Sequence, residues 1–366
     1  MTKPGAHSLA EIVSQPRCWS DSLKELEQAG LREKIGRQFG GAGEWLLVGC
    51  GSSYYLALSA AASWIAITGR RARAVPASEL LLFPDSVLTG SQNLAAVVIS
   101  RSGRTSEAVK AAQLLEEKKD VRTLAITCTP EQPLEQIATS AVVVLPANEE
   151  STVMTRSFTS MLLALQYVAT GLVGDHTMAK GLAELPTSAE RALKDLPSRI
   201  RKFVASHQVA DYICLGQGPF FGLACECALK LSEMSASYAQ SYHTLEFRHG
   251  PKSVVGPETL VAFLLSESGQ NAESGVLQET KALGGTTLTV INQADDRVRA
   301  SSDLLVELDF ELPELARLAP YVVASQLMGV YTGLKKGLDP DNPRNLSRVV
   351  TLDDGESLEN SEQASL

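Results

Sequence analysis

The chain has 366 residues, of which 44% are hydrophobic and 20% charged, a composition typical of a globular protein with room for two domains. Its formal net charge of −9 argues against nucleic acid as the main partner, because nucleic-acid-binding proteins usually carry a basic face. The most apolar stretch, residues 160–174, is too short to span a bilayer, and the N-terminus lacks a secretory signal pattern. These features favour a cytoplasmic protein that binds neither nucleic acid nor a membrane. An anionic substrate stays open, because backbone N–H groups and hydroxyls can hold one phosphate locally.

The six cysteines lie mostly in apolar segments. Only Cys225 and Cys227 form a close pair, and no second pair accompanies them, whereas zinc sites normally combine two spaced pairs of ligands. We therefore expect reduced thiols in the core, no bound metal and no cofactor.

In chain order, the pattern predicts an N-terminal helix at about residues 8–38 and then a buried strand at 44–49. This strand ends in the glycine turn Gly49-Cys-Gly-Ser-Ser53. A second apolar strand, at 94–99, runs into Ser100-Arg-Ser-Gly-Arg-Thr105 at the start of a helix. Two more strands, at 121–128 and 141–146, and an apolar helix at 158–172 complete the pattern.

The same order of elements recurs later in the chain. Leu215-Gly-Gln-Gly218 repeats the glycine turn at an offset of 167 residues, and Ser266-Glu-Ser-Gly269 repeats the serine-rich loop at an offset of 166. Apolar strands that alternate with amphipathic helices predict a parallel sheet covered on both faces. The expected fold class is therefore α/β, with two tandem doubly wound parallel-sheet units of common origin. The expected boundaries are 1–39 for an N-terminal helical segment, 40–175 for the first unit, 176–204 for a helical linker, 205–352 for the second unit and 353–366 for a polar tail.

The two loops of the first unit are the candidate ligand site, since such sheets bind ligands beyond the carboxyl ends of their strands. Glycines let the backbone approach a ligand closely, and hydroxyls at a helix start favour an anion. A dinucleotide fold is a rival, but Tyr54 takes the place of the third glycine in its usual motif. Helix capping alone would explain the serines of one loop, whereas two converging loops favour phosphate binding.

The second unit has departed from this phosphate-binding pattern. Pro219 and Phe220 replace the hydroxyls of the glycine turn, and Glu267 and Asn271 replace Arg101 and Thr105. An acidic residue is unfavourable beside a dianion. We therefore expect the first copy to bind the phosphate and the second to contribute something else.

That contribution is expected from a helix read over residues 224–239. Lys230 and Glu233 share one of its faces, although an exposed ion pair on a solvated surface is the default reading of this spacing. His249 follows in the polar run Glu246-Phe-Arg-His-Gly-Pro251, where it should be accessible. Histidine and glutamate are the side chains best suited to moving protons near neutral pH.

These motifs together resemble the SIS (sugar isomerase) superfamily in its double-domain form. The chain looks like the isomerase half of glucosamine-6-phosphate synthase and like the tagatose-6-phosphate ketose/aldose isomerase and amino-sugar-phosphate deaminase groups. The resemblance covers residues 40–352. It is carried by Gly49–Ser53, Ser100–Thr105, Leu215–Gly218, Ala228-Leu-Lys-Leu-Ser-Glu233 and Glu246–Pro251.

The resemblance implies a role for each candidate residue. Glu233 would carry a proton between C1 and C2 of a phosphorylated sugar or amino sugar, and Lys230 would assist near the sugar hydroxyls. His249 would help open the sugar ring from a neighbouring subunit, so the partner is expected to be a second copy in a homodimer with shared sites. The residues expected to bind substrate are Cys50, Gly51, Ser52, Ser53, Ser100, Arg101, Ser102, Thr105, Thr155 and Arg348.

Two departures from the synthase pattern shape the expected activity. The sequence shows no glutaminase segment, and Arg348 and Arg156 stand where the synthase has lysines, the first of them its Schiff-base lysine. Arginine stays protonated and does not readily form an imine. The expected activity is therefore isomerisation or deamination of a hexose-6-phosphate or amino-sugar-6-phosphate. A non-catalytic sugar-phosphate sensor is the alternative, although such sensors usually carry a helix-turn-helix domain.

Overall fold

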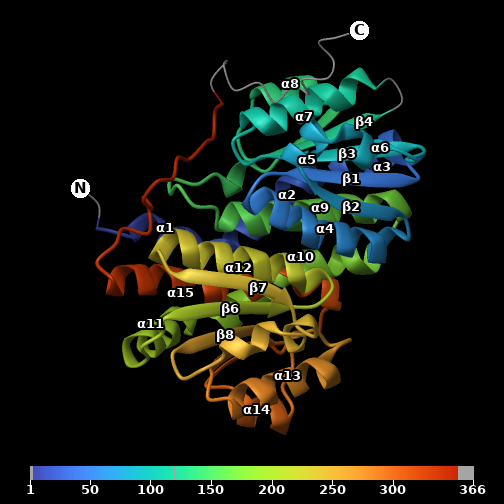
Figure 1. Ribbon diagram of the computed structural model, residues 1–366. Coiled ribbons are helices and arrows are strands. Elements are labelled where there is room, and N and C mark those ends of the chain that lie inside the picture. Colours follow the sequence, from blue (N-terminus) through green and yellow to red (C-terminus); the bar gives the residue numbers. More distant parts are fainter. Residues whose placement is uncertain (1–2, 119–120, 353–366) are drawn as a thin grey trace.

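The computed structural model describes residues 3–118 and 121–352, so the expected tail at 353–366 lies outside the described residues. Two five-stranded parallel sheets form the framework (Figure 1). The first has the order β2 (Arg71–Pro76), β1 (Glu44–Gly49), β3 (Leu94–Ile99), β4 (Arg122–Thr127), β5 (Ser140–Val143). The second has the order β7 (Tyr238–His243), β6 (Asp211–Gly216), β8 (Thr259–Leu264), β9 (Thr286–Ile291), β10 (Leu304–Glu307).

The two sheets have the same topology. Each begins with a central strand, adds one neighbour on one side and three in succession on the other, and all pairings are parallel. This confirms the α/β class with two repeated doubly wound units. Continuous burial of β1, β3, β6 and β8 explains why their apolar runs were readable from the sequence.

Each sheet also has an edge strand, β2 or β7, that the sequence pattern did not reveal. Neither edge strand forms a continuous apolar run, and β2 reads Arg-Ala-Arg-Ala-Val-Pro. An edge strand borders only one neighbour and keeps partly exposed side chains. The helix expected over residues 224–239 ends at Ser235, because Ala236 adopts a left-handed backbone with φ 46° and β7 begins at Tyr238.

The helical N-terminal segment consists of three helices rather than one. Ser14 separates α1 (Ala6–Val13) from α2 (Gln15–Gln28), and the link from α2 to α3 (Leu31–Phe39) contains Gly30, whose φ is 58°. Glycine adopts this left-handed backbone without a steric penalty, which explains the break.

The remaining helices connect and cover the two sheets. In the first unit they are α4 (Ser52–Thr68), α5 (Ala77–Leu82), α6 (Pro84–Leu88), α7 (Ser106–Glu117), α8 (Pro133–Ile137), η1 (Leu145–Ala147) and α9 (Arg156–Val173). Helices α10 (His176–Leu193) and α11 (Leu196–Ser206) link the units. The second unit contains α12 (Pro219–Ser235), η2 (Glu246–Arg248), η3 (Pro251–Val254), α13 (Gln270–Ala282), α14 (Asp296–Ser301), η4 (Glu314–Arg317), η5 (Ala319–Val322) and α15 (Val323–Lys335).

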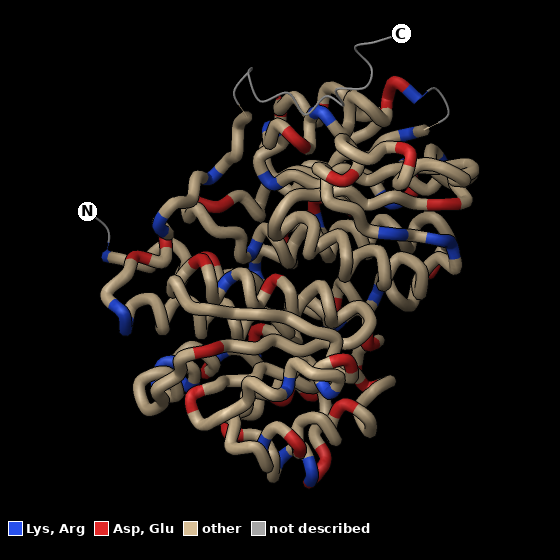
Figure 2. Tube along the Cα trace, viewed as in Figure 1, with Lys and Arg blue, Asp and Glu red and all other residues tan. Residues whose placement is uncertain are grey.

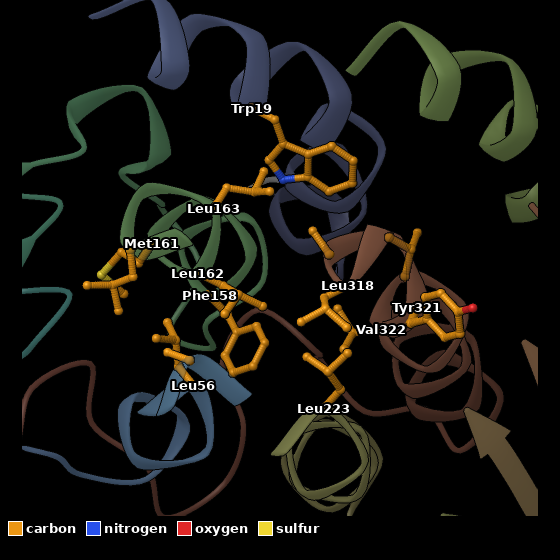
Figure 3. Packing of buried hydrophobic residues seen from close by; sticks show 14 of the residues in the cluster. Trp19, Leu56, Phe158, Met161, Leu162, Leu163, Leu223, Leu318, Tyr321 and Val322 are labelled. Carbon is orange, nitrogen blue, oxygen red and sulfur yellow. The ribbon is translucent and has the colours of Figure 1, made fainter. Parts of the chain in front are cut away.

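One apolar core joins the two units. Phe158 of α9, Leu56 of α4 and Leu223 of α12 are fully buried in it, and Val322 of η5 lies beside them (Figure 3). Burying a side chain of this size contributes about 1.5–3 kcal/mol relative to leaving it exposed. The helices between the sheets therefore hold the units together through shared apolar surface.

Helices α4 and α12 meet at this junction, and they run antiparallel. A Cβ atom on Gly222 would lie 2.5 Å from the carbonyl oxygen of Tyr55, whereas Glu226, one turn further along α12, contacts Ser52 at the start of α4. The close approach needs a glycine at position 222. It brings the second half of α12 to the carboxyl end of the first sheet.

Basic and acidic residues are interspersed along the trace of both units (Figure 2). None of the helices in residues 3–118 and 121–352 is long and apolar enough to cross a membrane.

Candidate functional site

The first glycine turn has a backbone that only glycines can form. A Cβ on Gly49 would lie 2.5 Å from the carbonyl of Ser53, and Gly51 has φ 53° and ψ −124°. The second unit repeats both features, since a Cβ on Gly216 would lie 2.3 Å from the carbonyl oxygen of Phe220 and Gly218 has φ 55° and ψ −127°. The duplication thus preserved the turn itself, and the two turns differ in the side chains that they present.

Ser52 connects this turn to the second unit. Its hydroxyl donates a hydrogen bond of 3.1 Å to Glu226 Oε1 and accepts one of 3.1 Å from Lys230 Nζ. Lys230 Nζ also lies 3.3 Å from Glu226 Oε1 and 2.5 Å from Glu233 Oε2. We call Ser52, Glu226, Lys230 and Glu233 the junction cluster.

The junction cluster is buried, so the reading of Lys230 and Glu233 as a solvated surface pair is wrong. The side chains of Lys230 and Glu226 are 0% exposed, and that of Glu233 is 18% exposed. The physical reason is the antiparallel packing of α4 against α12, which covers this face of the helix. Glu233 is the one ionisable member that keeps contact with the surroundings.

Burial and charge set the protonation of the cluster. Burial raises the pKa of Glu226 to about 7, Lys230 opposes this rise, and Glu233 adds to it. Burial by itself would lower the pKa of Lys230, but Glu226 and Glu233 together raise it above its ordinary value. Lys230 is therefore an ammonium at neutral pH, and Glu226 can gain or lose a proton there.

Glu226 is a residue that sequence reasoning missed. It precedes Lys230 by four positions on α12, the spacing at which two side chains share a helix face. Its Oε2 atom is buried and has no hydrogen-bond partner within the described part of the chain. The i,i+4 spacing was a signal, but it could not show that this face is buried.

The serine-rich loop forms a compact cluster of hydroxyls where α7 begins. Ser100 Oγ lies 3.2 Å from Thr105 Oγ1 and accepts a hydrogen bond of 3.2 Å from the N–H of Gly103, and Ser102 Oγ lies 3.5 Å from Thr105 Oγ1. Gly103 has φ 64°, and a Cβ there would lie 2.7 Å from Cβ of Gln132. The loop is thus closed tightly around its own hydroxyls.

Arg101 points away from these hydroxyls. Its guanidinium is 7% exposed and donates to Glu149 Oε2 at 3.3 Å and to the carbonyls of Thr152, Val153 and Arg348 at 2.8, 3.1 and 3.2 Å. Because the guanidinium donates to these four acceptors of the protein, it is not free to bind substrate. The expectation of direct side-chain binding is therefore replaced by a role in holding the segment at residues 149–153.

The carboxylate of Glu149 organises the start of α9. It accepts hydrogen bonds of 2.7 Å from both the N–H and the hydroxyl of Thr155, and it accepts two more from the N–H and the hydroxyl of Ser157. Thr155 is fully buried, so its hydroxyl is committed to this carboxylate. No sequence motif marked Glu149. The groups that donate to it come together only in the folded chain.

The segment around Arg348 lies against the first unit although it follows the second. Its guanidinium donates to the carbonyl of Glu149 and, at 3.2 Å, to Oδ1 of Asn148, and Val350 accepts a hydrogen bond of 3.3 Å from the N–H of Ser106. The C-terminal part of the described chain therefore reaches the serine-rich loop, and Arg348 lies at the edge of the candidate site.

Cys50 and Ser53 complete the glycine turn. Burial raises the pKa of the Cys50 thiol to about 12, so the thiol is not a nucleophile at neutral pH. Ser53 is buried in the first turn of α4, and its hydroxyl has no hydrogen-bond partner among residues 3–118 and 121–352. Ser53 thus keeps a free hydroxyl beside the turn.

His249 of the same chain is not brought into the junction cluster. Its loop lies at the carboxyl end of β6, where the N–H of Thr244 donates to the carbonyl of Gly216 at 3.3 Å, beside the start of α12. Glu233 lies fourteen residues along that helix from Pro219, which corresponds to about 21 Å at 1.5 Å per residue. His249 is also exposed. The structure therefore does not bring His249 and Glu233 of one chain together.

The fold and the site thus define an α/β protein of two repeated units, in which loops of the first unit and a helix of the second form one candidate site. Residues 41–171 match the model of the SIS domain family. This match covers most of the first unit, and the resemblance to tandem SIS proteins expected from the sequence is confirmed.

Relatives of known description support this assignment. The chain is 27% identical over 349 residues to a glutamine–fructose-6-phosphate aminotransferase (isomerizing) of Methanothermobacter thermautotrophicus, covering 94% of this chain but only 57% of that protein. The chain therefore spans little more than half the length of this relative. Among solved structures, glucosamine-6-phosphate deaminase from Thermotoga maritima matches with a TM-score of 0.78 and 27% identity, covering 95% of this chain and 100% of that one. Tagatose-6-phosphate ketose/aldose isomerase from Escherichia coli shares the fold, with a TM-score of 0.82 and 22% identity over 97% and 100% of the two chains.

Proposed function

We propose that this protein is a phosphosugar isomerase or deaminase that acts on a hexose-6-phosphate or an amino-sugar-6-phosphate. The observation that carries the proposal is the junction cluster, where a buried ammonium lies 2.5 Å from the partly accessible carboxylate of Glu233 at the carboxyl end of the first sheet. This is the place at which doubly wound sheets bind ligands. The names of the structural relatives, which act on 6-phosphorylated sugars, favour the same substrate class.

In the proposed reaction the serine-rich loop binds the phosphate and Glu233 moves one proton between neighbouring carbons. The carboxylate takes the proton from one of C1 and C2 and returns it to the other, so an enediol or enolamine forms and collapses without net loss of a proton. The Lys230 ammonium, held protonated by its two carboxylates, would stabilise the negative oxygen that develops. For an amino sugar, water adds to C2 of the resulting imine and ammonia leaves.

The same geometry argues against an imine between the protein and the sugar. Lys230 is protonated and bound to two carboxylates and a hydroxyl, and Arg348 cannot readily lose its proton. We therefore propose direct enediol chemistry. The six cysteines are free thiols, which supports the cytoplasm as the location of the protein.

Turnover assays with defined sugars test the proposal. The protein is incubated with glucosamine-6-phosphate, galactosamine-6-phosphate, fructose-6-phosphate and tagatose-6-phosphate, and both ammonia release and aldose/ketose interconversion are followed. Interconversion or ammonia release, with solvent deuterium entering C1 or C2, is the expected result. Binding of a phosphosugar without any turnover would instead identify a sugar-phosphate sensor.

Substitution of Ser102 tests the phosphate loop, with the second loop as a matched control. Ser102→Ala removes one hydroxyl from the hydroxyl cluster and is expected to raise KM for the phosphosugar about 10- to 150-fold, since a hydrogen bond to a charged group contributes about 1.5–3 kcal/mol. Ser268→Ala, the equivalent change 166 residues later, should leave KM unchanged. Equal effects of both substitutions on KM would contradict the assignment of the phosphate to the first loop.

Mixing two inactive variants tests the proposed homodimer with shared sites. Glu233→Gln and His249→Ala each damage every site when alone. In a mixed dimer one site regains Glu233 from one chain and His249 from the other, so random exchange should restore about a quarter of the wild-type rate. The rate is measured after the two variants are unfolded and refolded together. No recovery, in a mixture whose mixed dimers are verified by differential tagging, would show that the two residues do not act across subunits.

A further inference from the structure

The second serine-rich loop, Ser266–Gly269, already holds an anion that belongs to the protein. The N–H of Glu267 donates to Glu314 Oε1 at 2.5 Å, and the hydroxyl of Ser268 donates to Glu314 Oε2 at 3.0 Å. Glu314 lies on η4, which follows the last strand of the second sheet. The two donors thus bind the two oxygens of one carboxylate, as they would bind two oxygens of a phosphate.

The first loop has the same donors without this occupant. By the repeat offset, the N–H of Arg101 and the hydroxyl of Ser102 correspond to the donors on Glu267 and Ser268. In the part of the chain that the structure describes, no carboxylate accepts a hydrogen bond from either of them. By the same offset Asn148 stands at the position of Glu314, and the neighbouring carboxylate of Glu149 accepts instead from the side chains of Arg101 and Thr155.

The side chains around the second loop are compatible with the bound carboxylate of Glu314. Glu267 forms a bidentate ion pair with the buried Arg317, at 2.7 and 2.6 Å. In the first unit the charges are reversed, since the loop residue is Arg101 and its partner is Glu149. The pair with Arg317 neutralises the carboxylate of Glu267 beside the backbone N–H that faces Glu314. The loop therefore keeps an anion-binding backbone although its sequence has become acidic.

The second loop also lacks a counterpart of the junction cluster on α4. Counting back by the offset of 167 residues between the two glycine turns, the first-unit counterparts of Glu226, Lys230 and Glu233 are Ser59, Ser63 and Ala66 on α4. None of these three can act as an acid or base near neutral pH. An anion bound at the second loop would meet no proton-transfer group equivalent to the junction cluster.

We propose that the second serine-rich loop is a degenerate anion site in which the Glu314 carboxylate takes the place of a phosphate. This contact closes one of two duplicated sites and leaves one phosphate site per chain. The loop itself still binds a tetrahedral oxyanion once the carboxylate is removed. This inference concerns a different loop from the proposed active site and does not require that site to be catalytic.

Glu314→Ala in the full chain tests the inference, with inorganic phosphate as the probe. Equilibrium dialysis should show one more phosphate bound per chain than in the wild type, and phosphate should raise Tm by about 2–4 °C more in this variant than in the wild type. Glu311→Ala is the matched control, since Glu311 lies on the same segment, is exposed, and forms no hydrogen bond or ion pair with a residue in 3–118 or 121–352. Its phosphate binding should equal that of the wild type.

The count distinguishes this inference from the proposed function. If the first loop binds no phosphate, the wild type should bind none and Glu314→Ala one, whereas the expected numbers are one and two. Turnover of the variant should stay within twofold of the wild type. Equal phosphate counts and equal Tm responses in the variant and wild type would overturn the inference. If the alanine variant does not fold, Glu314→Gln keeps the shape of the side chain and should show the same extra phosphate at higher concentration.

Discussion

Glu233→Gln is expected to lower the turnover number for the phosphosugar by about 10²–10⁴-fold, the usual contribution of a positioned general base. Glutamine has nearly the shape of glutamate but cannot accept a proton from carbon. Because the serine-rich loop is untouched, the dissociation constant of the phosphosugar should change much less than turnover. Solvent-deuterium exchange at C1 or C2, measured by NMR, should fall together with the turnover number.

The matched control is Glu184→Gln, which neutralises a glutamate in an exposed pair with Lys180 on α10. It removes the same charge from the chain and should leave turnover unchanged. Deuterium exchange that persists in Glu233→Gln at the wild-type rate would exclude Glu233 as the base. Exchange lost in both variants would point to a general effect of charge rather than to the junction cluster.

Lys230→Met is expected to destabilise the fold by about 3–5 kcal/mol at neutral pH, because it leaves the buried carboxyls without their cation. The destabilisation should depend on pH in a defined direction. Glu226 already has a pKa of about 7 against an ordinary value of 4.5, and removal of the ammonium raises it further. The unfolded chain releases this proton near pH 4.5, whereas the folded variant retains it up to its raised pKa. The free energy of unfolding of the variant therefore falls as pH rises between these two pKa values. Urea unfolding at pH 5 and pH 8 measures the difference.

Two further variants distinguish the effect of an uncompensated buried carboxylate from the general effect of removing a lysine. Lys230→Met with Glu226→Gln should recover part of the lost stability at pH 8 and little at pH 5, where Glu226 is largely protonated. Lys180→Met removes an exposed lysine from its pair with Glu184 and should cost less than about 1 kcal/mol at either pH. A loss in Lys230→Met that is the same at pH 5 and pH 8 would contradict the assigned protonation of Glu226.

The two glycine turns have nearly the same backbone conformation. Both glycine turns keep the same φ and ψ values, yet Ser52 of the first joins the junction cluster, and the second presents Pro219 at that point. The side chains, and not the backbone, therefore distinguish the two copies. The contact of Glu314 with the second loop adds a difference between the two serine-rich loops.

The sequence by itself determined the repeat, the α/β class and the position of the loops. These features are local: an apolar run is buried wherever it forms a central strand, and a glycine turn has its conformation whatever surrounds it. The edge strands β2 and β7 were not predicted, because their side chains form no continuous apolar run and each strand is defined by its pairing with β1 or β6. The break in the N-terminal helix at Gly30 was not predicted, because an isolated glycine is also tolerated inside a helical pattern.

Only the tertiary structure decided how the candidate residues are used. Ser52 and Glu226 are 174 positions apart, and their hydrogen bond exists because α4 and α12 pack antiparallel through Gly222. The same packing buries Lys230, which its spacing alone assigned to the surface. Arg101 turns inward because Glu149 and three carbonyls surround its guanidinium, and His249 lies at the far end of α12 from Glu233. Each of these depends on contacts between distant segments, so no local pattern in the sequence specifies them.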